Sequence, residues 1–253
     1  MSNERLRGSI AAAGLSIEGL AAAVQVDPKT VERWITLDRK PHRRNRWDVA
    51  RRLDVEEVYL WPAVAQDPQT LVASEAEFVR LYPNRGAVPA PFWRSLVSSA
   101  RDSLDFLAFA ALFLPDMNPD LADILKGRAE AGARVRILLG DPHGEAIHRR
   151  GHEEGIGAGL AECAQIVLRH LAPLSDVNGI EIRLHDTTLY TSIFRSDATM
   201  LVNAHVYGAP AAANPVLHLQ RVPGGRMFDT YQTSFDRVWT EARTYEPKAT
   251  TRR

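Results

Sequence analysis

The sequence predicts a small all-α domain followed by a larger α/β domain with a mixed sheet. Residues 15–37 have the spacing of two amphipathic helices joined by a tight turn, each with its own start signal. From residue 91 onward, apolar strand-like runs alternate with amphipathic helices, which favours a sheet with at least one parallel pair. The chain has 253 residues, 45% of them hydrophobic and 25% charged, which is enough for two buried cores.

The two helices in residues 15–37 are each marked by a residue that can cap them. Ser16 is placed to cap the first helix and Asp27 the second, with Pro28 at the first helical position, where its missing N–H costs nothing. The apolar residues of the second helix turn one face inward. The outward face near its amino end then carries Lys29, Thr30 and Arg33, which are groove-reading positions in a helix-turn-helix. An ordinary helical hairpin has the same spacing.

The distribution of charge favours nucleic-acid binding over a plain hairpin. Between Lys29 and Arg52 there are nine basic and three acidic residues, a net charge of +6. Because 31 basic and 31 acidic residues cancel over the whole chain, the remainder carries −6. A basic block beside a helix-turn-helix pattern is typical of a protein that contacts DNA phosphates.

The first 62 residues resemble the lambda-repressor-like (Cro-type, XRE-class) DNA-binding domain. The resemblance covers LSIEGLAAAVQVDPKTVERWI, the turn around DRKP, the helix NRWDVARRLDV and the closing LWP. It implies that the helix from Pro28 to Thr36 enters the major groove of double-stranded DNA, with Lys29, Thr30 and Arg33 near base edges. Residues 39–44 form a longer and more basic loop than a compact domain requires. The resemblance implies backbone contacts from the following residues, with Lys40 included as part of the same loop: Ser16, Arg39, Lys40, Arg43, Arg44 and Arg46.

The predicted domains are 1–62 for DNA binding, 63–90 as a linker, 91–245 as the α/β domain and 246–253 as a flexible tail. The linker contains a helical stretch, LVASEAEFVRLY, and several prolines. The α/β domain is predicted to contain, in order, a helix in APFWRSLVSSARDS, a strand in LDFLAFAALFL, a helix in LADILKGRAEAG, a strand in ARVRILLGDP, a helix in GLAECAQIVLRHLAPL, strands in IEIRLHD, TLYTSIFRSD and TMLVNAHVYG, and a helix in FDTYQTSFDRVWTEA.

The α/β domain resembles a phospholipase-D-like domain of the kind fused to helix-turn-helix units in actinomycete-type regulators. The resemblance rests on the GDP turn at residues 140–142, the late β-hairpin and the final helix with SFDRVW. Catalytic members carry H-x-K-x4-D followed by G-S-x-N. In the best register those positions hold Tyr190, Ser192 and Asp197, then Ala204, His205 and Tyr207, so the nucleophilic histidine and the lysine are missing. A register starting at His185 also lacks the lysine. We therefore expect no enzymatic activity.

Polar residues at every second position of the late strands share one face of each strand. They predict a ligand pocket where the resemblance places a phosphate. The candidate ligand-binding residues are His185, Tyr190, Ser192, Asn203, His205 and Tyr207. Each histidine, taken alone, is as easily a solvated or internally hydrogen-bonded ring. Arg85 in YPNRG reads as an exposed loop residue and is left out of the pocket. We expect no cofactor and no metal site, because the histidines and glutamates of residues 143–154 lack a third ligand at a suitable spacing.

The sequence therefore predicts a DNA-binding transcriptional regulator whose second domain senses a ligand, dimerises, or does both. The expected partners are double-stranded DNA, a second copy of the chain held mainly by residues 90–245, and a phosphorylated or nucleotide-like small molecule. The alternatives are a phosphodiesterase or nuclease of the phospholipase-D superfamily, and a scaffold that only dimerises the first domain. A single cysteine, Cys163, and the lack of a long apolar run predict a cytoplasmic protein with no membrane contact.

Overall fold

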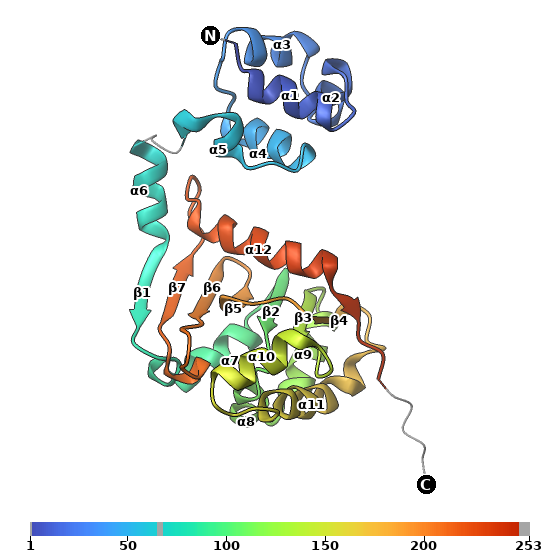
Figure 1. Cartoon of the computed structure of the whole chain (residues 1–253), viewed down its shortest axis with the longest axis vertical. Helices are drawn as coiled ribbons and strands as arrows, with labels where there is room; N and C mark the ends of the chain where they lie inside the picture. The colour runs from blue at the N-terminus through green and yellow to red at the C-terminus, as the bar shows by residue number, and fades with distance from the viewer. Residues whose placement is uncertain (1, 65–67, 248–253) are drawn as a thin grey trace. The chain divides into compact units, whose positions relative to one another are not determined.

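The structure, a computed structural model, describes residues 2–64 and 68–247 (Figure 1). Contacts divide the chain into two compact units. The N-terminal unit runs up to residue 75 and includes the turn 223–225, and the C-terminal unit holds the remainder. Across the described ranges, no helix combines the length and apolar character that crossing a membrane would require. The predicted tail falls partly on residues 248–253, which lie outside the described residues.

The N-terminal unit is built only of helices in its described part, as the sequence predicts. Its core contains Leu6, Leu20, Val31, Trp34 and Val49, each almost completely buried. The elements are α1 (Glu4–Ala12), α2 (Ile17–Ala23), α3 (Pro28–Thr36), α4 (Arg43–Arg52), α5 (Glu57–Leu60) and the 3-10 helix η1 (Pro62–Val64).

The helix pair α2 and α3 begins at the two predicted caps. Ser16 Oγ accepts a hydrogen bond of 3.0 Å from the backbone N–H of Gly19, and Asp27 Oδ1 accepts one of 2.8 Å from the N–H of Lys29. Both bonds satisfy amide groups that have no partner within the helix, so the capping prediction is confirmed. Gln25, in the turn between the helices, has a φ of 56°, which reverses the chain within a few residues.

The C-terminal unit is an α/β domain with a mixed sheet. The described strands form one eight-stranded sheet in the order β1-β7-β6-β5-β2-β3-β4-β8, with β2, β3 and β4 parallel and the other pairs antiparallel. The predicted parallel pair is therefore confirmed. The helix α6 (Pro68–Glu77) begins in the N-terminal unit and leads into this sheet. The elements that follow it are β1 (Phe78–Tyr82), η2 (Arg85–Ala87), α7 (Ala90–Ser98), β2 (Ser103–Ala108), α8 (Phe113–Met117), α9 (Leu121–Glu130), β3 (Arg134–Gly140), α10 (Glu145–Glu153), α11 (Gly159–Leu171), η3 (Ala172–Leu174), β4 (Ile180–His185), β5 (Thr191–Ser196), β6 (Thr199–Ala204), η4 (Ala211–Ala213), β7 (Val216–Gln220), α12 (Met227–Glu241) and β8 (Arg243–Thr244).

Each face of the sheet is covered by its own hydrophobic core. On one face, α7, α8, α9 and the end of α11 pack against β2 to β5, with Trp93, Leu125 and Phe194 fully buried. On the other face, α10, the start of α11 and α12 pack around Phe228 and Phe235. The alternation of side chains along each strand separates the two cores.

Residues 71–82 differ from the sequence prediction of a continuous helix. The helix α6 ends at Glu77, and Phe78–Tyr82 form the edge strand β1, which pairs antiparallel with β7. The buried carboxylate of Glu77 accepts hydrogen bonds from the N–H groups of Met227 (2.7 Å) and Phe228 (3.3 Å) at the start of α12. A segment predicted as linker therefore contributes a strand to the main sheet and a cap to the last helix.

Candidate functional site

The outer face of α3 presents polar side chains above a buried apolar face. Lys29 and Arg33 are exposed and Thr30 is half-buried. The opposite face of the same helix packs inward through Val31, Trp34 and Ile35, each at most 3% exposed. Because that packing fixes the rotation of the helix, the three predicted base-reading residues point away from the core together.

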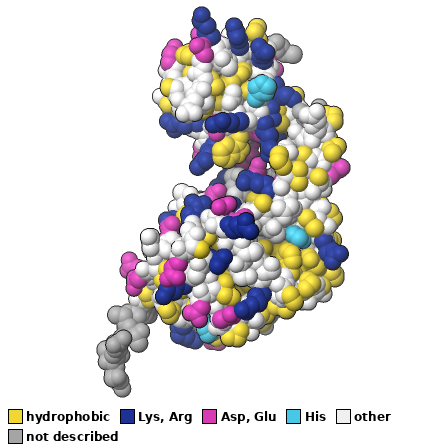
Figure 2. Space-filling model, turned by 180° about the vertical axis from the view of Figure 1, so that it is seen from behind, with side chains coloured by type: hydrophobic (Ala, Val, Ile, Leu, Met, Phe, Trp, Pro, Cys, Tyr) yellow, Lys and Arg dark blue, Asp and Glu magenta, His cyan; other side chains and the backbone are white. Residues whose placement is uncertain are grey.

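Arginines also occupy the start of α4. Arg43 and Arg44 lie in the first turn of this helix, and that turn contains no acidic residue. Cations at a helix amino terminus face the positive end of the helix dipole, so this placement is unfavourable unless an anion sits nearby. Arg39 and Lys40, in the preceding loop, are exposed. Figure 2 shows Lys and Arg side chains recurring over the visible face of the N-terminal unit.

Arg46 does not belong to this exposed basic surface. The residue is only 7% exposed, and its side chain forms an ion pair with Glu57 and donates a hydrogen bond of 2.8 Å to the carbonyl of Pro41. A buried guanidinium with both of these partners is not available to a DNA phosphate. This corrects the expectation for Arg46, which fastens α4 to α5 and to the loop before it.

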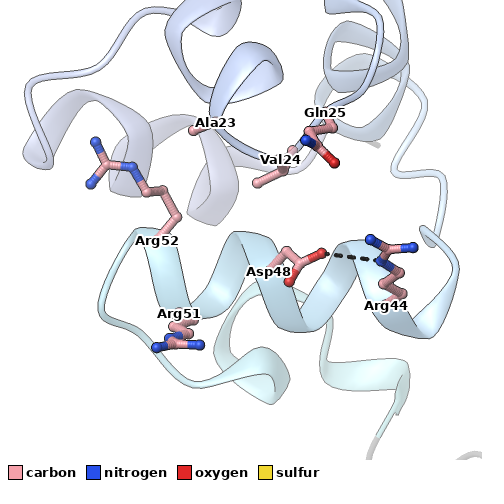
Figure 3. A pocket seen from close by; sticks show the side chains of 7 residues that line it. All are labelled: Ala23, Val24, Gln25, Arg44, Asp48, Arg51 and Arg52. Atoms are coloured by element: carbon pink, nitrogen blue, oxygen red, sulfur yellow. Dashed lines mark ion pairs between the residues drawn. The ribbon is translucent and has the colours of Figure 1, made fainter.

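A hollow of about 380 Å³ lies between the end of α2 and one side of α4 (Figure 3). Arg44, at the start of α4, and Asp48, one turn further along the helix, form an ion pair of 3.9 Å, drawn as a dashed line in Figure 3. The residues lining the hollow are Ala23, Val24, Gln25, Arg44, Asp48, Arg51 and Arg52. None of the three α3 residues predicted to read bases lines it, so the hollow is separate from the outer face of α3.

In the C-terminal unit, Ser192 and His205 form a hydrogen-bonded pair at the end of the sheet. Ser192 Oγ lies 2.9 Å from His205 Nε2, and His205 Nδ1 lies 3.2 Å from the carbonyl oxygen of Leu189. The carbonyl can only accept, so it selects the Nδ1–H tautomer and leaves Nε2 to accept the serine hydroxyl. The ring of Phe109 stacks on that of His205 with centroids 5.8 Å apart.

The surroundings of His205 keep its ring neutral. Burial, together with the positive charges of Arg150 and Arg85, lowers the pKa of His205 from 6.5 to about 4. At neutral pH the ring is therefore uncharged. A general base works best when its pKa is near the operating pH, so His205 would activate the serine weakly.

His185 and Asn203 are buried beside this pair. His185 is 2% exposed; its Nε2 donates to the carbonyl of Ala108 at 3.2 Å, and its Nδ1 accepts from the N–H of Thr187 at 3.3 Å. Both ring nitrogens have partners, which corrects the expectation that His185 faces a ligand. Asn203 Nδ2 donates to the carbonyls of Asn214 and Pro215, both at 3.2 Å, and its Oδ1 is buried without a described hydrogen-bond partner.

The two predicted tyrosines differ from the rest of the set. Tyr190 is 81% exposed and Tyr207 is 82% exposed, although the backbone N–H of His205 bonds to the carbonyl of Tyr190 at 2.8 Å. The structure thus brings Ser192, Asn203 and His205 together and leaves both tyrosine rings in solvent.

The aspartate of the phospholipase-D motif register lies at the opposite end of the sheet. Asp197 has a φ of 50° in the turn between β5 and β6, and its carboxylate accepts three hydrogen bonds of 2.9 Å, from the N–H groups of Arg101, Asp102 and Ser103. It holds the loop before β2. Arg195 pairs with buried Asp105 at 2.9 Å on the α12 face of the sheet, opposite to the face that carries Ser192, and so does not stand in for the lysine absent from the motif register.

Arg85 and Arg150 are cations near His205 that lie outside the predicted pocket. Arg150 belongs to α10 and pairs with Glu154 at 2.6 Å. The Arg85 guanidinium lies 4.2 Å from the centre of the Phe113 ring, and η2, which carries it, packs against η4. Arg85 lies just beyond the strand β1, a position at which a site residue could have been expected. This position is missed in the sequence because β1 is predicted as helix.

Residues 94–246 match the family described as Domain of unknown function (DUF5919), and the chain belongs to this family. The match covers most of the C-terminal unit. No curated protein matches the chain.

Two solved structures show weak similarity to this chain. A phospholipase D family member, Nuc from Salmonella typhimurium, is 13% identical over 66% of this chain and 97% of its own, with a TM-score of 0.42. TrmBL2, an archaeal chromatin protein described as showing a novel mode of DNA binding, is 14% identical over 87% of this chain and 72% of its own, with a TM-score of 0.42. Because both TM-scores are below 0.5, neither comparison establishes a shared fold.

Proposed function

We propose that this protein is a DNA-binding transcriptional regulator of the XRE class, with a degenerate phospholipase-D-like domain that senses a small molecule, dimerises, or does both. The observation that carries the proposal is the outer face of α3. Lys29, Thr30 and Arg33 stand together on the outside of a capped helix whose inner face is locked into the core. In a helix-turn-helix, α2 would cross the backbone and α3 would lie in the major groove.

The basic residues around this helix support contacts with the DNA backbone. Arg39, Lys40, Arg43 and Arg44 follow α3 directly, and the start of α4 would gain from a phosphate that offsets two arginines in its first turn. Ser16, at the cap of α2, is the remaining candidate on this surface.

DNA binding is tested by gel-shift titration of the full chain at several salt concentrations. We expect Arg33→Ala to weaken specific binding by about 1–3 kcal/mol, and Arg43→Ala/Arg44→Ala to weaken binding to all sequences and flatten its salt dependence. Arg7→Ala is the matched control, because Arg7 is exposed on α1 outside the basic run. Binding that does not depend on salt, or no binding to any genomic fragment, would contradict the proposal.

For the C-terminal domain we propose binding without catalysis. The register that aligns Asp197 with the motif has Tyr190 in place of the nucleophilic histidine and Ser192 in place of the lysine. Losing a positioned donor or cation of this kind typically costs on the order of 10² to 10³ in rate, and the lowered pKa of His205 makes its ring a weak substitute base. Hydrolysis of a generic phosphodiester that disappears in His205→Ala would favour the alternative, a phosphodiesterase.

Ligand sensing is proposed at the end of the sheet where Ser192 and His205 meet. Buried Ser192 and Asn203, half-buried His205 and two exposed tyrosines place hydrogen-bonding and aromatic groups side by side there. A thermal-shift screen with nucleotides, phosphorylated metabolites and uncharged compounds tests this site. At least one compound should stabilise the wild type more than the Tyr190→Ala/His205→Ala double variant. If no compound does so, the case for a ligand site is lost.

A further inference from the structure

We propose that Arg85 binds the phosphate or carboxylate group of a small molecule at the end of the sheet where Ser192 and His205 meet. This inference rests on the proposed ligand site and names both its anchoring residue and the chemical class of its ligand. Its starting point is the guanidinium of Arg85, which stacks on the ring of Phe113 but forms no hydrogen bond or salt bridge among the described residues.

Packing places Arg85 on the same side of the sheet as Ser192. Its guanidinium lies 4.2 Å from the centre of the Phe113 ring, and that ring packs edge-on against Phe194 with centroids 5.6 Å apart. Phe194 and Ser192 are two residues apart on β5 and therefore share a face of the sheet, separated by roughly 7 Å along the strand. The contacts therefore run from Arg85 to Phe113, from Phe113 to Phe194, and then along β5 to Ser192.

Strand register places Arg85 at the same end of the sheet. Tyr82, the last residue of β1, is opposite Val216, which is opposite Asn203, which is opposite Ser192. Arg85 follows Tyr82 by three residues, in η2. That 3-10 helix packs against η4, which immediately precedes Asn214, the residue whose carbonyl accepts from Asn203. The row of paired residues and the contact between η2 and η4 therefore both place Arg85 at the end of the sheet that holds Ser192.

Partners distinguish Arg85 from the other arginine at this end. Arg150 pairs with Glu154 at 2.6 Å and Glu153 at 3.5 Å, and donates to the carbonyl of Ala209 at 2.7 Å. Arg85 has the attraction of Glu154 at longer range but, among the described residues, no hydrogen bond or salt bridge. Its planar guanidinium therefore offers donors for an oxyanion, the group that arginine recognises with two parallel hydrogen bonds.

The neighbouring groups suit an anion that is part of a larger molecule. Ser192 supplies a hydroxyl whose proton can turn from Nε2 of the neutral His205 ring to an oxyanion. The exposed rings of Tyr190 and Tyr207 offer flat apolar faces beside the site. Partial burial lowers the pKa of Arg85, yet the group stays charged because an arginine cannot be deprotonated at physiological pH.

The test is calorimetric titration of the full chain with inorganic phosphate, phenyl phosphate and benzoate, with phenol as the uncharged probe. We expect at least one of the three anions to bind the wild type and phenol not to bind. Arg85→Gln should weaken that binding at least tenfold, and Arg85→Lys should weaken it less, because lysine keeps the charge but loses the planar donor pair. The preferred anion identifies the oxyanion as phosphate or carboxylate.

Arg80→Gln is the matched control, because Arg80 also lies over an aromatic ring, that of Tyr82, at 5.8 Å. It should bind within twofold of the wild type. Equal anion binding by wild type and Arg85→Gln, or no binding of any of the three anions at millimolar concentration, would overturn the inference. The broader ligand site would still stand if an uncharged compound stabilises the wild type but not the Tyr190→Ala/His205→Ala variant, so the two failures are distinguishable.

Discussion

His205 gives the C-terminal unit a stability that depends on pH. Its pKa is about 4 in the folded chain, lowered by burial and by Arg150 and Arg85, against about 6.5 when unfolded. Between these values the unfolded chain binds a proton that the folded chain does not, so the free energy of unfolding falls as pH falls from 6.5 towards 4 and levels off below. The shift corresponds to a loss of roughly 3 kcal/mol at most.

Urea unfolding at pH 7, 5.5 and 4.5 measures this dependence. His205→Asn should flatten the fall in stability over that range, whatever its stability at pH 7. His170→Asn, at an exposed position on α11, should keep the wild-type dependence. An unchanged pH dependence in His205→Asn would show that other groups, such as buried His185, account for it.

The sequence correctly predicts the role of a single residue when its hydrogen-bond partner lies a few positions away in the chain. The Ser16 and Asp27 caps depend only on positions two or three residues away, and both are confirmed. The roles of Arg46 and His185 depend on Glu57 and Ala108, which tertiary packing brings to them. A basic residue in a basic run, and a histidine in a polar cluster, look the same in sequence whether they face solvent or an internal partner.

Among the elements, α12 depends on a cap supplied 150 residues earlier in the chain. Glu77 accepts hydrogen bonds from the N–H groups of Met227 and Phe228 and lies against the positive end of the helix dipole. Glu77→Ala leaves these donors buried and without their acceptor. We expect it to lower the free energy of unfolding by about 0.5–2 kcal/mol, in the range of lost helix caps.

Thermal unfolding of the two single variants at positions 75 and 77 tests this role. Glu75→Ala is the control, because Glu75 is exposed on the same helix. The Glu77 variant should melt earlier than the Glu75 variant. Equal melting temperatures would mean that water replaces the carboxylate at no cost.

Helices and strands are predicted correctly where the hydrophobic periodicity is strong. The prediction is wrong where one segment changes from helix to strand. The strands β2 and β3 are apolar runs separated by amphipathic helices, and they are predicted correctly, as is the strand β4 that follows α11. The strand β1 is missed because FVRLY continues the apolar spacing of α6, and the strand exists only through pairing with β7. Neither β7 nor the two-residue β8 was predicted.

For the whole molecule, the sequence predicts the two-part order of an α-helical and an α/β unit, but only part of the candidate ligand site. Ser192, Asn203 and His205 share a strand face, which parity predicts. Arg85 reaches the same region through β1 and through a ring contact with Phe113, and neither can be derived from local spacing. Sites assembled from separate segments are visible only in three dimensions.

At the scale of the whole molecule, the exposed edge strand β1 supports the proposed homodimer. Phe78, Val79 and Leu81 are 46%, 50% and 57% exposed on a strand whose outer edge has no partner among the described residues. An antiparallel pair of such edges is self-complementary about a two-fold axis. This strand lies outside residues 90–245, where the sequence placed the interface.

We expect sedimentation velocity to show a dimer of the wild type at micromolar concentration. Leu81→Lys should shift it towards monomer, because a charge on an exposed edge strand opposes edge-to-edge pairing. Ile156→Lys, which places the same charge at another exposed apolar position, should remain dimeric. A dimer that survives Leu81→Lys would return the interface to residues 90–245, and a wild-type monomer both with and without DNA would refute the homodimer.

The same variants connect the dimer to DNA recognition. A dimeric helix-turn-helix protein reads two half-sites about 34 Å apart, so its affinity for a two-site operator exceeds that for one site when both helices bind together. Leu81→Lys should therefore lose affinity for the two-site operator while binding a single half-site as the wild type does. Gel-shift titration with both fragments measures the difference, and equal losses on both would indicate that the substitution disturbs the N-terminal unit itself.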